Sequence, residues 1–157
     1  MTFITNHVTK VLCVIGLAAA GLAVAPGTAG AYVPAPPCLG ASCNGKDPYI
    51  INREGINCVS SAYTVTSFSL DHGFVTIALR FSPYCQANWA DAYVKYQAAD
   101  GGEMWVQNKN NDEQATGWSD NPYGTYWTNM VNGIPKAQAC TMDSNTYTVN
   151  PGCTGWY

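Results

Sequence analysis

The cysteines of this chain constrain its fold more than any other feature. Seven are present, and one of them, Cys13, lies in an apolar run near the start. The other six follow residue 31. An even set of cysteines in an exported chain is typical of a disulfide framework. The six are Cys38, Cys43, Cys58, Cys85, Cys140 and Cys153.

Residues 1–31 have the pattern of a secretory signal peptide. Lys10 precedes an apolar run over residues 11–25, and the small residues Ala29-Gly30-Ala31 follow. A basic start, a short apolar segment and an A-x-A site are the marks of such a signal. The run is shorter than the roughly 20 residues of a membrane helix, so an uncleaved anchor is the less favoured alternative. We expect a secreted protein, extracellular or associated with the cell wall, with no membrane span after signal removal.

The composition indicates a polar but weakly charged surface. Charged residues make up 11% of the chain, and the formal net charge is −3. In ordinary domains about a quarter of all residues are charged. Because no basic cluster is present, nucleic acid and anionic lipid are poor candidates for a partner. An extracellular β domain rich in Tyr, Trp, Asn, Thr and Gly fits this profile.

A change of pattern separates a leader from one folded domain. Residues 32–37 form a proline-rich leader, and residues 38–157 form a single domain whose first part, up to Cys58, is expected to be looped. From residue 73 to 82, apolar and polar residues alternate with the period of a β-strand. The preceding residues 62–70 are rich in β-branched and aromatic side chains. The turn Asp71-His72-Gly73 therefore predicts a hairpin.

Turn signals predict two further hairpins. The first joins residues 90–97 to 103–109 through a Gly-rich loop at residues 98–102. The second joins residues 123–131 to 135–142 through Asn132-Gly133. The polar residues 108–124 between them are expected to form a long exposed loop. No segment has helical periodicity over three turns, so we expect an all-β fold, a small antiparallel barrel or sandwich stapled by disulfides.

Several motifs resemble a known family. The chain has the order C-x4-C-x-G-K-D-P, then Cys58, then L-R-F-S-P-x-C-x-A-x-W-A, and residues 126–131 are similar to a later Y-x-x-M-V segment. This order resembles an exported actinobacterial family catalogued as domain of unknown function 2690. The likeness spans residues 38–140 and implies a place outside the membrane, but no reaction. The residues that carry it are Cys38, Cys43, Gly45, Lys46, Asp47, Pro48, Cys58, Leu79, Arg80, Phe81, Ser82, Pro83, Cys85, Ala87, Trp89 and Ala90.

The cysteines are better interpreted as disulfides than as metal ligands or a redox pair. Zinc needs four Cys or His ligands, and His72 is the one histidine after residue 31. A redox pair favours C-x-x-C, whereas four residues separate Cys38 and Cys43. The first four cysteines fall in the block that resembles the family, and Cys140 and Cys153 are neighbours near the end. We therefore predict a Cys140–Cys153 pair and leave open the three arrangements of the other four.

Catalysis and cofactors are not expected. A glycosidase needs two facing carboxylates, but Glu103, Asp112, Glu113 and Asp120 have no apolar setting that would raise a pKa. A small hydrolase using Glu103 and Asp120 remains an alternative. His72 has the neighbours of a turn residue rather than those of a catalytic base.

Calcium is a further alternative at the polar segment. Oxygen ligands occur at alternate positions, Asn108, Asn110 and Asp112. The Gly and Glu of a calcium loop are missing at their positions, so no metal is predicted.

Two charged stretches are interpreted as structural. Lys46-Asp47-Pro48 has the composition of a turn in which Asp47 accepts backbone N–H groups, with an exposed contact loop as the alternative. Arg80 lies on the polar face of its strand, and we expect it to pair with Asp47 or Asp91.

Aromatic side chains give the best candidate site. Flat rings can stack on the apolar CH faces of sugars while neighbouring amides bond to the hydroxyls. The alternative is that the rings fill the core or cover a sheet, which we favour for Trp89 and Trp105. The candidate glycan-binding residues are Trp118, Asn121, Tyr123, Tyr126, Trp127 and Asn129.

The leading hypothesis is a secreted, non-catalytic β domain that associates with the cell envelope or its polysaccharides. The alternative is a disulfide-stapled protein ligand, a secreted inhibitor or effector, that binds a partner protein through the exposed loop at residues 108–124.

Overall fold

Strands dominate the described part of the chain. The computed structural model describes residues 32–70, 73, 75–95, 102–118, 123–143 and 152–157, without the side chains of residues 118 and 143. Among these residues, none of the helices has the length and hydropathy of a membrane span. The elements are η1 (Gly40–Cys43), η2 (Val59–Ser61), β1 (Tyr63–Leu70), β2 (Val75–Ser82), β3 (Ala87–Val94), β4 (Gly102–Asn108), β5 (Glu113–Trp118), β6 (Gly124–Trp127), β7 (Val131–Asn132), β8 (Ala137–Asp143) and β9 (Gly152–Cys153).

The first sheet is built around the strand with the clearest alternation. Its order is β1-β2-β3-β6, and the short β7 also pairs with β3. In β2, Val75, Ile77 and Leu79 are buried, whereas the residues between them are half-buried. The antiparallel hairpin of β1 and β2 is confirmed, with Phe68 opposite Ile77.

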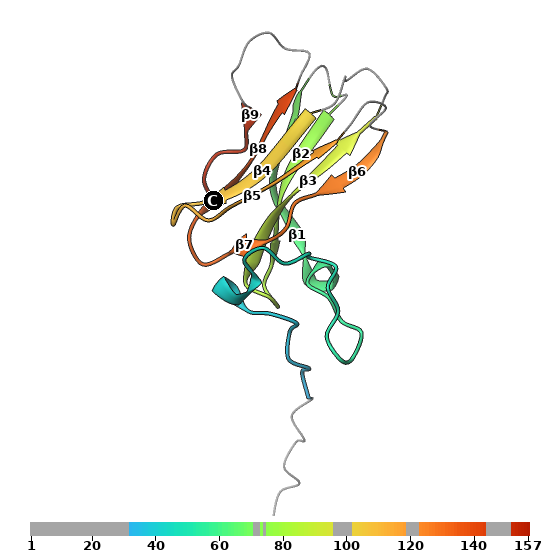
Figure 1. Cartoon of the computed structure of the whole chain (residues 1–157), viewed down its shortest axis with the longest axis vertical. Coiled ribbons are helices and arrows are strands. Elements are labelled where there is room, and N and C mark those ends of the chain that lie inside the picture. Colours follow the sequence, from blue (N-terminus) through green and yellow to red (C-terminus); the bar gives the residue numbers. More distant parts are fainter. Residues whose placement is uncertain (1–31, 71–72, 74, 96–101, 119–122, 144–151) are drawn as a thin grey trace, which may run out of the picture. The chain divides into compact units, whose positions relative to one another are not determined.

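The second sheet faces the first across the core (Figure 1). Its order is β5-β4-β8-β9, and every strand pair is antiparallel. Burial of the facing apolar side chains removes them from water, which stabilises both layers. The buried residues of this core are Val75, Ile77, Leu79, Ala90, Ala92, Val94, Met104, Val106, Val131, Ala137 and Ala139.

The predicted fold class is confirmed, but two of the predicted hairpins are wrong. The described residues form an antiparallel all-β fold of two open sheets with three disulfides. However, β3 and β4 lie in different sheets, and so do β7 and β8. A turn such as Asn132-Gly133 reverses the chain equally well within a sheet and between two layers, so turn chemistry alone does not identify the strand partner.

The predicted long loop at residues 108–124 is also wrong, because much of it is strand β5. Asn108 closes a tight turn, in which its Oδ1 accepts hydrogen bonds from the backbone N–H groups of Asn110 and Asp112 at 3.0 and 3.1 Å. This turn sets β5 antiparallel to β4, with Gln114 opposite Val106. This polar edge strand forms because of its backbone hydrogen bonds to β4 and the preceding turn, and its sequence shows no apolar periodicity.

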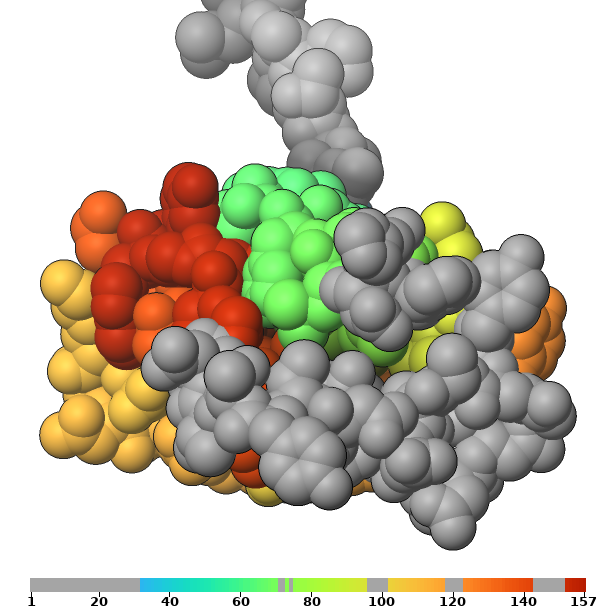
Figure 2. Space-filling model, turned by 90° about the horizontal axis from the view of Figure 1, so that it is seen from above, coloured from blue at the N-terminus to red at the C-terminus, as the bar shows by residue number. Residues whose placement is uncertain are grey.

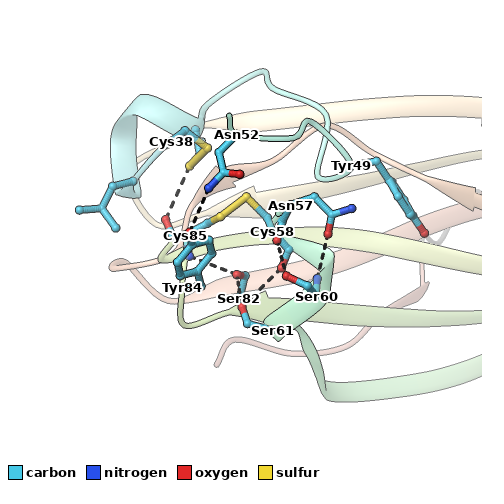
Figure 3. The surroundings of a disulfide bond; sticks show 12 residues. Cys38, Tyr49, Asn52, Asn57, Cys58, Ser60, Ser61, Ser82, Tyr84 and Cys85 are labelled. Carbon is cyan, nitrogen blue, oxygen red and sulfur yellow. Dashed lines mark hydrogen bonds between the residues drawn. A yellow bond between two sulfur atoms is a disulfide. The ribbon is translucent and has the colours of Figure 1, made fainter. Parts of the chain in front are cut away.

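The cysteine-rich residues 38–62 form a block that covers part of the outer face of the first sheet, the face opposite the core. Figure 3 shows the disulfide Cys58–Cys85, which joins this block to the turn after β2. The Ser61 and Ser82 hydroxyls are hydrogen-bonded at 2.8 Å beside it. Under the block lies Trp89, which is 1% exposed. The expected core role of Trp89 is therefore confirmed.

The last described residues extend the second sheet. Cys140 and Cys153 lie opposite each other in β8 and β9 and form the predicted disulfide. Figure 2 shows the C-terminal residues, in red, beside the green residues of β1 and β2. There Gly152 packs so closely on Phe68 that an added Cβ would lie 2.6 Å from its Cε2.

Candidate functional site

Part of the outer face of the first sheet is left uncovered by the cysteine-rich block. Strand alternation puts Trp89, Asp91 and Tyr93 on this face, and the block covers it at Trp89. Beyond the block, the face carries hydroxyls and aromatic rings. Its two cross-strand rows are Ser69, Thr76, Tyr93 and Thr125, then Ser67, Ala78, Asp91 and Trp127.

Three exposed rings gather at the β3–β6 side of this face. The ring of Tyr49 lies against that of Trp127, with centroids 4.6 Å apart and planes tilted by 50°. Tyr93 is a diagonal neighbour of Trp127 across the β3–β6 pair. The exposed fractions of the three residues lie between 38% and 45%. We call Tyr49, Tyr93 and Trp127 the aromatic platform.

The turn in the cysteine-rich block positions Tyr49. The backbone N–H of Tyr49 donates to Asp47 Oδ1 at 2.8 Å, and that of Ile50 donates to the Asp47 carbonyl at 3.1 Å. The predicted turn at Lys46-Asp47-Pro48 is thereby confirmed. On the side of Trp127, the Met130 N–H donates to the Lys46 carbonyl at 2.8 Å, so the block and the chain after β6 are tied together.

One ion pair lies next to the platform. Arg80 Nε is 3.5 Å from Asp91 Oδ2, which confirms one of the two predicted partners of Arg80. Trp89 Nε1 donates to the other carboxylate oxygen at 2.9 Å. Burial raises the pKa of Asp91, and Arg80 and the Trp89 hydrogen bond oppose that rise. Asp91 is opposite Trp127 in the register, so a hydrogen-bond acceptor stands beside the ring.

A hollow adjoins the platform between the edge strands β5 and β6. Its volume is about 190 Å³, and it is lined by Thr116, Thr125, Tyr126 and Trp127. The lining therefore combines two aromatic residues with two hydroxyl-bearing ones. These are the groups that can contact the CH faces and the hydroxyls of one sugar ring.

The predicted glycan-binding residues occupy different places. Tyr123 is 69% exposed just before β6, and Asn129 is exposed just after it. Trp127 joins the platform, whereas Tyr126 packs against the core and lines the hollow. The side chain of Trp118, at the end of β5, and the whole of Asn121 lie outside the described residues.

Two platform residues were missed by the sequence analysis. Tyr93 shares the face of Trp89 by simple alternation, so the strand pattern contained a signal for it. The sequence around Tyr49 contained no such signal, because the contact of Tyr49 with Trp127 depends on how the block folds back over the sheet.

Three cysteine sulfur atoms also lie close together, and all of them belong to disulfide bonds. The Sγ atoms of Cys38, Cys43 and Cys58 all lie within 4.8 Å of one another. A metal would need thiolates there, whereas the disulfides Cys38–Cys43 and Cys58–Cys85 use all of these sulfurs. The cluster is therefore a pair of adjacent staples in the buried part of the block.

The oxygen-bearing side chains considered as calcium ligands and those considered as catalytic groups lie at separate positions. Asn108 Oδ1 is engaged by the turn at the start of β5, and Asn108 Nδ2 donates to Asp112 Oδ2 at 2.8 Å. Glu103 is exposed at the start of β4. His72 and Asp120 lie outside the described residues.

Fold and site together define a disulfide-stapled domain of two antiparallel sheets with an exposed aromatic face. The family model described as protein of unknown function DUF2690 matches residues 41–147, more than half of the chain, and the chain belongs to this family. The match includes β1 to β8 and leaves out Cys38 and Cys153. Neither curated proteins nor solved structures gave a match.

Proposed function

We propose that this protein is a secreted, non-catalytic domain that binds cell-envelope polysaccharide through the aromatic platform. The signal-like start of the sequence and the three disulfides support export, since disulfides persist in oxidising compartments.

One observation carries the binding proposal. The rings of Tyr49, Tyr93 and Trp127 are exposed on a sheet face whose other described side chains are largely hydroxyls. Exposed aromatic residues that gather on one face favour an interaction surface, whereas single exposed ones need no explanation.

The chemistry of the face suits a sugar better than a protein or an ion. Sugar rings present flat CH patches that stack on aromatic rings, and their hydroxyls bond to uncharged donors and acceptors. The hollow beside Trp127 adds Thr116 and Thr125 hydroxyls to the same surface. Asp91, opposite Trp127, supplies an acceptor for a sugar hydroxyl.

A sedimentation assay tests the proposal. The mature protein is mixed with purified Gram-positive cell walls, insoluble chitin or cellulose, and the bound fraction is measured after centrifugation. We expect saturable pelleting on at least one of these glycans, weakened at least about tenfold by Trp127→Ala, which corresponds to about 1.4 kcal/mol.

A matched control is available on another part of the surface. Trp156 is exposed to 37%, close to the 38% of Trp127, and packs near Lys109 rather than on the platform. Trp156→Ala should leave pelleting unchanged. Absence of pelleting on every glycan would overturn the proposal and favour the alternative of a protein ligand, to be sought by capture from secreted protein.

A further inference from the structure

A second hollow lies between the two sheets, away from the platform. Its volume is about 190 Å³. Tyr63 and Val65 of β1 and Leu79 and Phe81 of β2 line one side of it. Tyr157 lies on the other side, where it is held to β8 by hydrogen bonds between its backbone and that of Ala137 at 2.8 and 2.9 Å.

Aromatic rings and backbone give this hollow its shape. Tyr63 and Phe81 meet edge to face, with centroids 5.8 Å apart. Gly133 closes the hollow beside Phe81, so tightly that an added Cβ would lie 2.8 Å from Phe81 Cε2. Tyr63 and Tyr157 are both more than half exposed, which leaves the hollow open to solvent between them.

The buried polar side chain that lines the hollow is Asn88. This residue is opposite Phe81 in the register, lines the hollow and is 4% exposed. Within the described residues its side-chain amide has no hydrogen-bond partner in the protein, and Arg80 Nε is the polar side-chain atom that is fully buried without one, so the Asn88 amide reaches the solvent in the hollow. An amide in the wall of an open hollow bonds to water in the free protein, and a ligand that displaces this water has to replace its hydrogen bonds.

The size and lining of the hollow define the ligand. An engineered apolar cavity of about 150 Å³ holds benzene, so this hollow has room for a single ring. A sugar ring would bring several hydroxyls to a wall with one amide, and hydroxyls buried without partners are costly. The lining has no acidic or basic side chain that would balance a charged ligand.

We propose that the hollow formed by Tyr63, Phe81, Asn88 and Tyr157 binds one neutral aromatic ring with a single hydrogen-bonding substituent. The ring packs between the aromatic residues, and its substituent bonds to the Asn88 amide. The site is distinct from the aromatic platform and does not depend on polysaccharide binding.

Phenol is the simplest probe, and a titration followed by amide chemical shifts gives the test. At concentrations up to about 10 mM, phenol should shift the amide signals of the lining residues saturably. Val65→Phe, which fills the hollow, should abolish this binding, and Asn88→Leu should weaken it about tenfold. Tyr157→Ala, which opens the hollow from the other side, should also weaken it if Val65→Phe does not fold. Trp127→Ala should leave phenol binding unchanged, which separates this site from the platform.

Two arms identify the ligand class. N-acetyltyrosinamide tests whether the ring can be reached when it is carried by a peptide, and its binding would point to a tyrosine of a partner protein as the source. Exclusion of this compound while phenol binds would point to a free small molecule. The proposal is overturned if phenol shifts no lining residue, if Val65→Phe leaves its binding intact, or if tetramethylammonium binds more tightly than phenol.

Discussion

Tyr49 and Trp127 join two parts of the fold that are far apart in the sequence. Their ring centroids are 4.6 Å apart, with Tyr49 in the cysteine-rich block and Trp127 in β6. Aromatic pairs of this kind contribute about 0.5–1.5 kcal/mol beyond the area they bury. We expect a double-mutant cycle of Tyr49→Ala and Trp127→Ala, measured by urea unfolding, to give a coupling energy in this range. Additive effects of the two substitutions would show that the contact contributes nothing to stability.

The three disulfides should differ in their contribution to stability. The separations of 27 residues for Cys58–Cys85, 13 for Cys140–Cys153 and 5 for Cys38–Cys43 correspond to about 3.5, 3 and 2 kcal/mol on the chain-entropy model. Urea unfolding of the three paired Cys→Ala variants should follow this order. A larger loss for the shortest loop would mean that native packing around the sulfurs, rather than chain entropy, decides the ranking.

Asp91 should make folding stability depend on pH in a specific direction. Burial raises the pKa of Asp91 above its ordinary value of 3.8, against the opposing effects of Arg80 and Trp89. Between 3.8 and the raised pKa, the folded state binds more protons than the unfolded state, so the free energy of unfolding falls as pH increases through that window.

The variant Asp91→Asn isolates this effect, because an amide oxygen can still accept the hydrogen bond from Trp89. We expect the free energy of unfolding of the native protein, relative to Asp91→Asn, to decrease as pH increases from 3.8 through the raised pKa. Chemical denaturation at a series of pH values measures the difference. If the difference instead grows with pH, the ion pair with Arg80 outweighs burial.

Gly152 should tolerate no larger side chain. An alanine Cβ there would lie 2.6 Å from Phe68 Cε2 and 3.1 Å from Leu70 Cδ2. Overpacking of this kind costs about 1–3 kcal/mol. Gly152→Ala should lower the free energy of unfolding by that amount, and by less in a Phe68→Leu background, where the ring edge is gone. An equal loss in both backgrounds would mean that the strain arises elsewhere than at the ring.

Much of the first sheet could be predicted from local pattern. Alternation in β2 identified a strand with one buried face, and the preceding β-branched segment identified its hairpin partner. The even set of cysteines indicated disulfides, and the nearness of Cys140 to Cys153 identified one pair. Each of these inferences depends on residues that are close in the sequence or on a period that the backbone imposes.

The remaining features depend on contacts that the sequence does not encode locally. Strand β5 was missed because Asn108 and the ladder with β4 hold a polar segment that lacks apolar alternation. The platform was only partly identified, since Tyr49 reaches Trp127 through the path of the block between Cys43 and Cys58. Asn88 was not predicted as a site residue, because the hollow that it lines forms only where the two sheets and Tyr157 meet.

The most direct test of the central claim is a binding isotherm on purified Gram-positive cell walls for the native protein, Trp127→Ala and Trp156→Ala. The proposed function predicts saturable binding that Trp127→Ala weakens at least about tenfold and Trp156→Ala leaves unchanged. Equal binding by all three proteins would contradict the platform as the site, and no binding by the native protein would contradict the envelope-binding function itself.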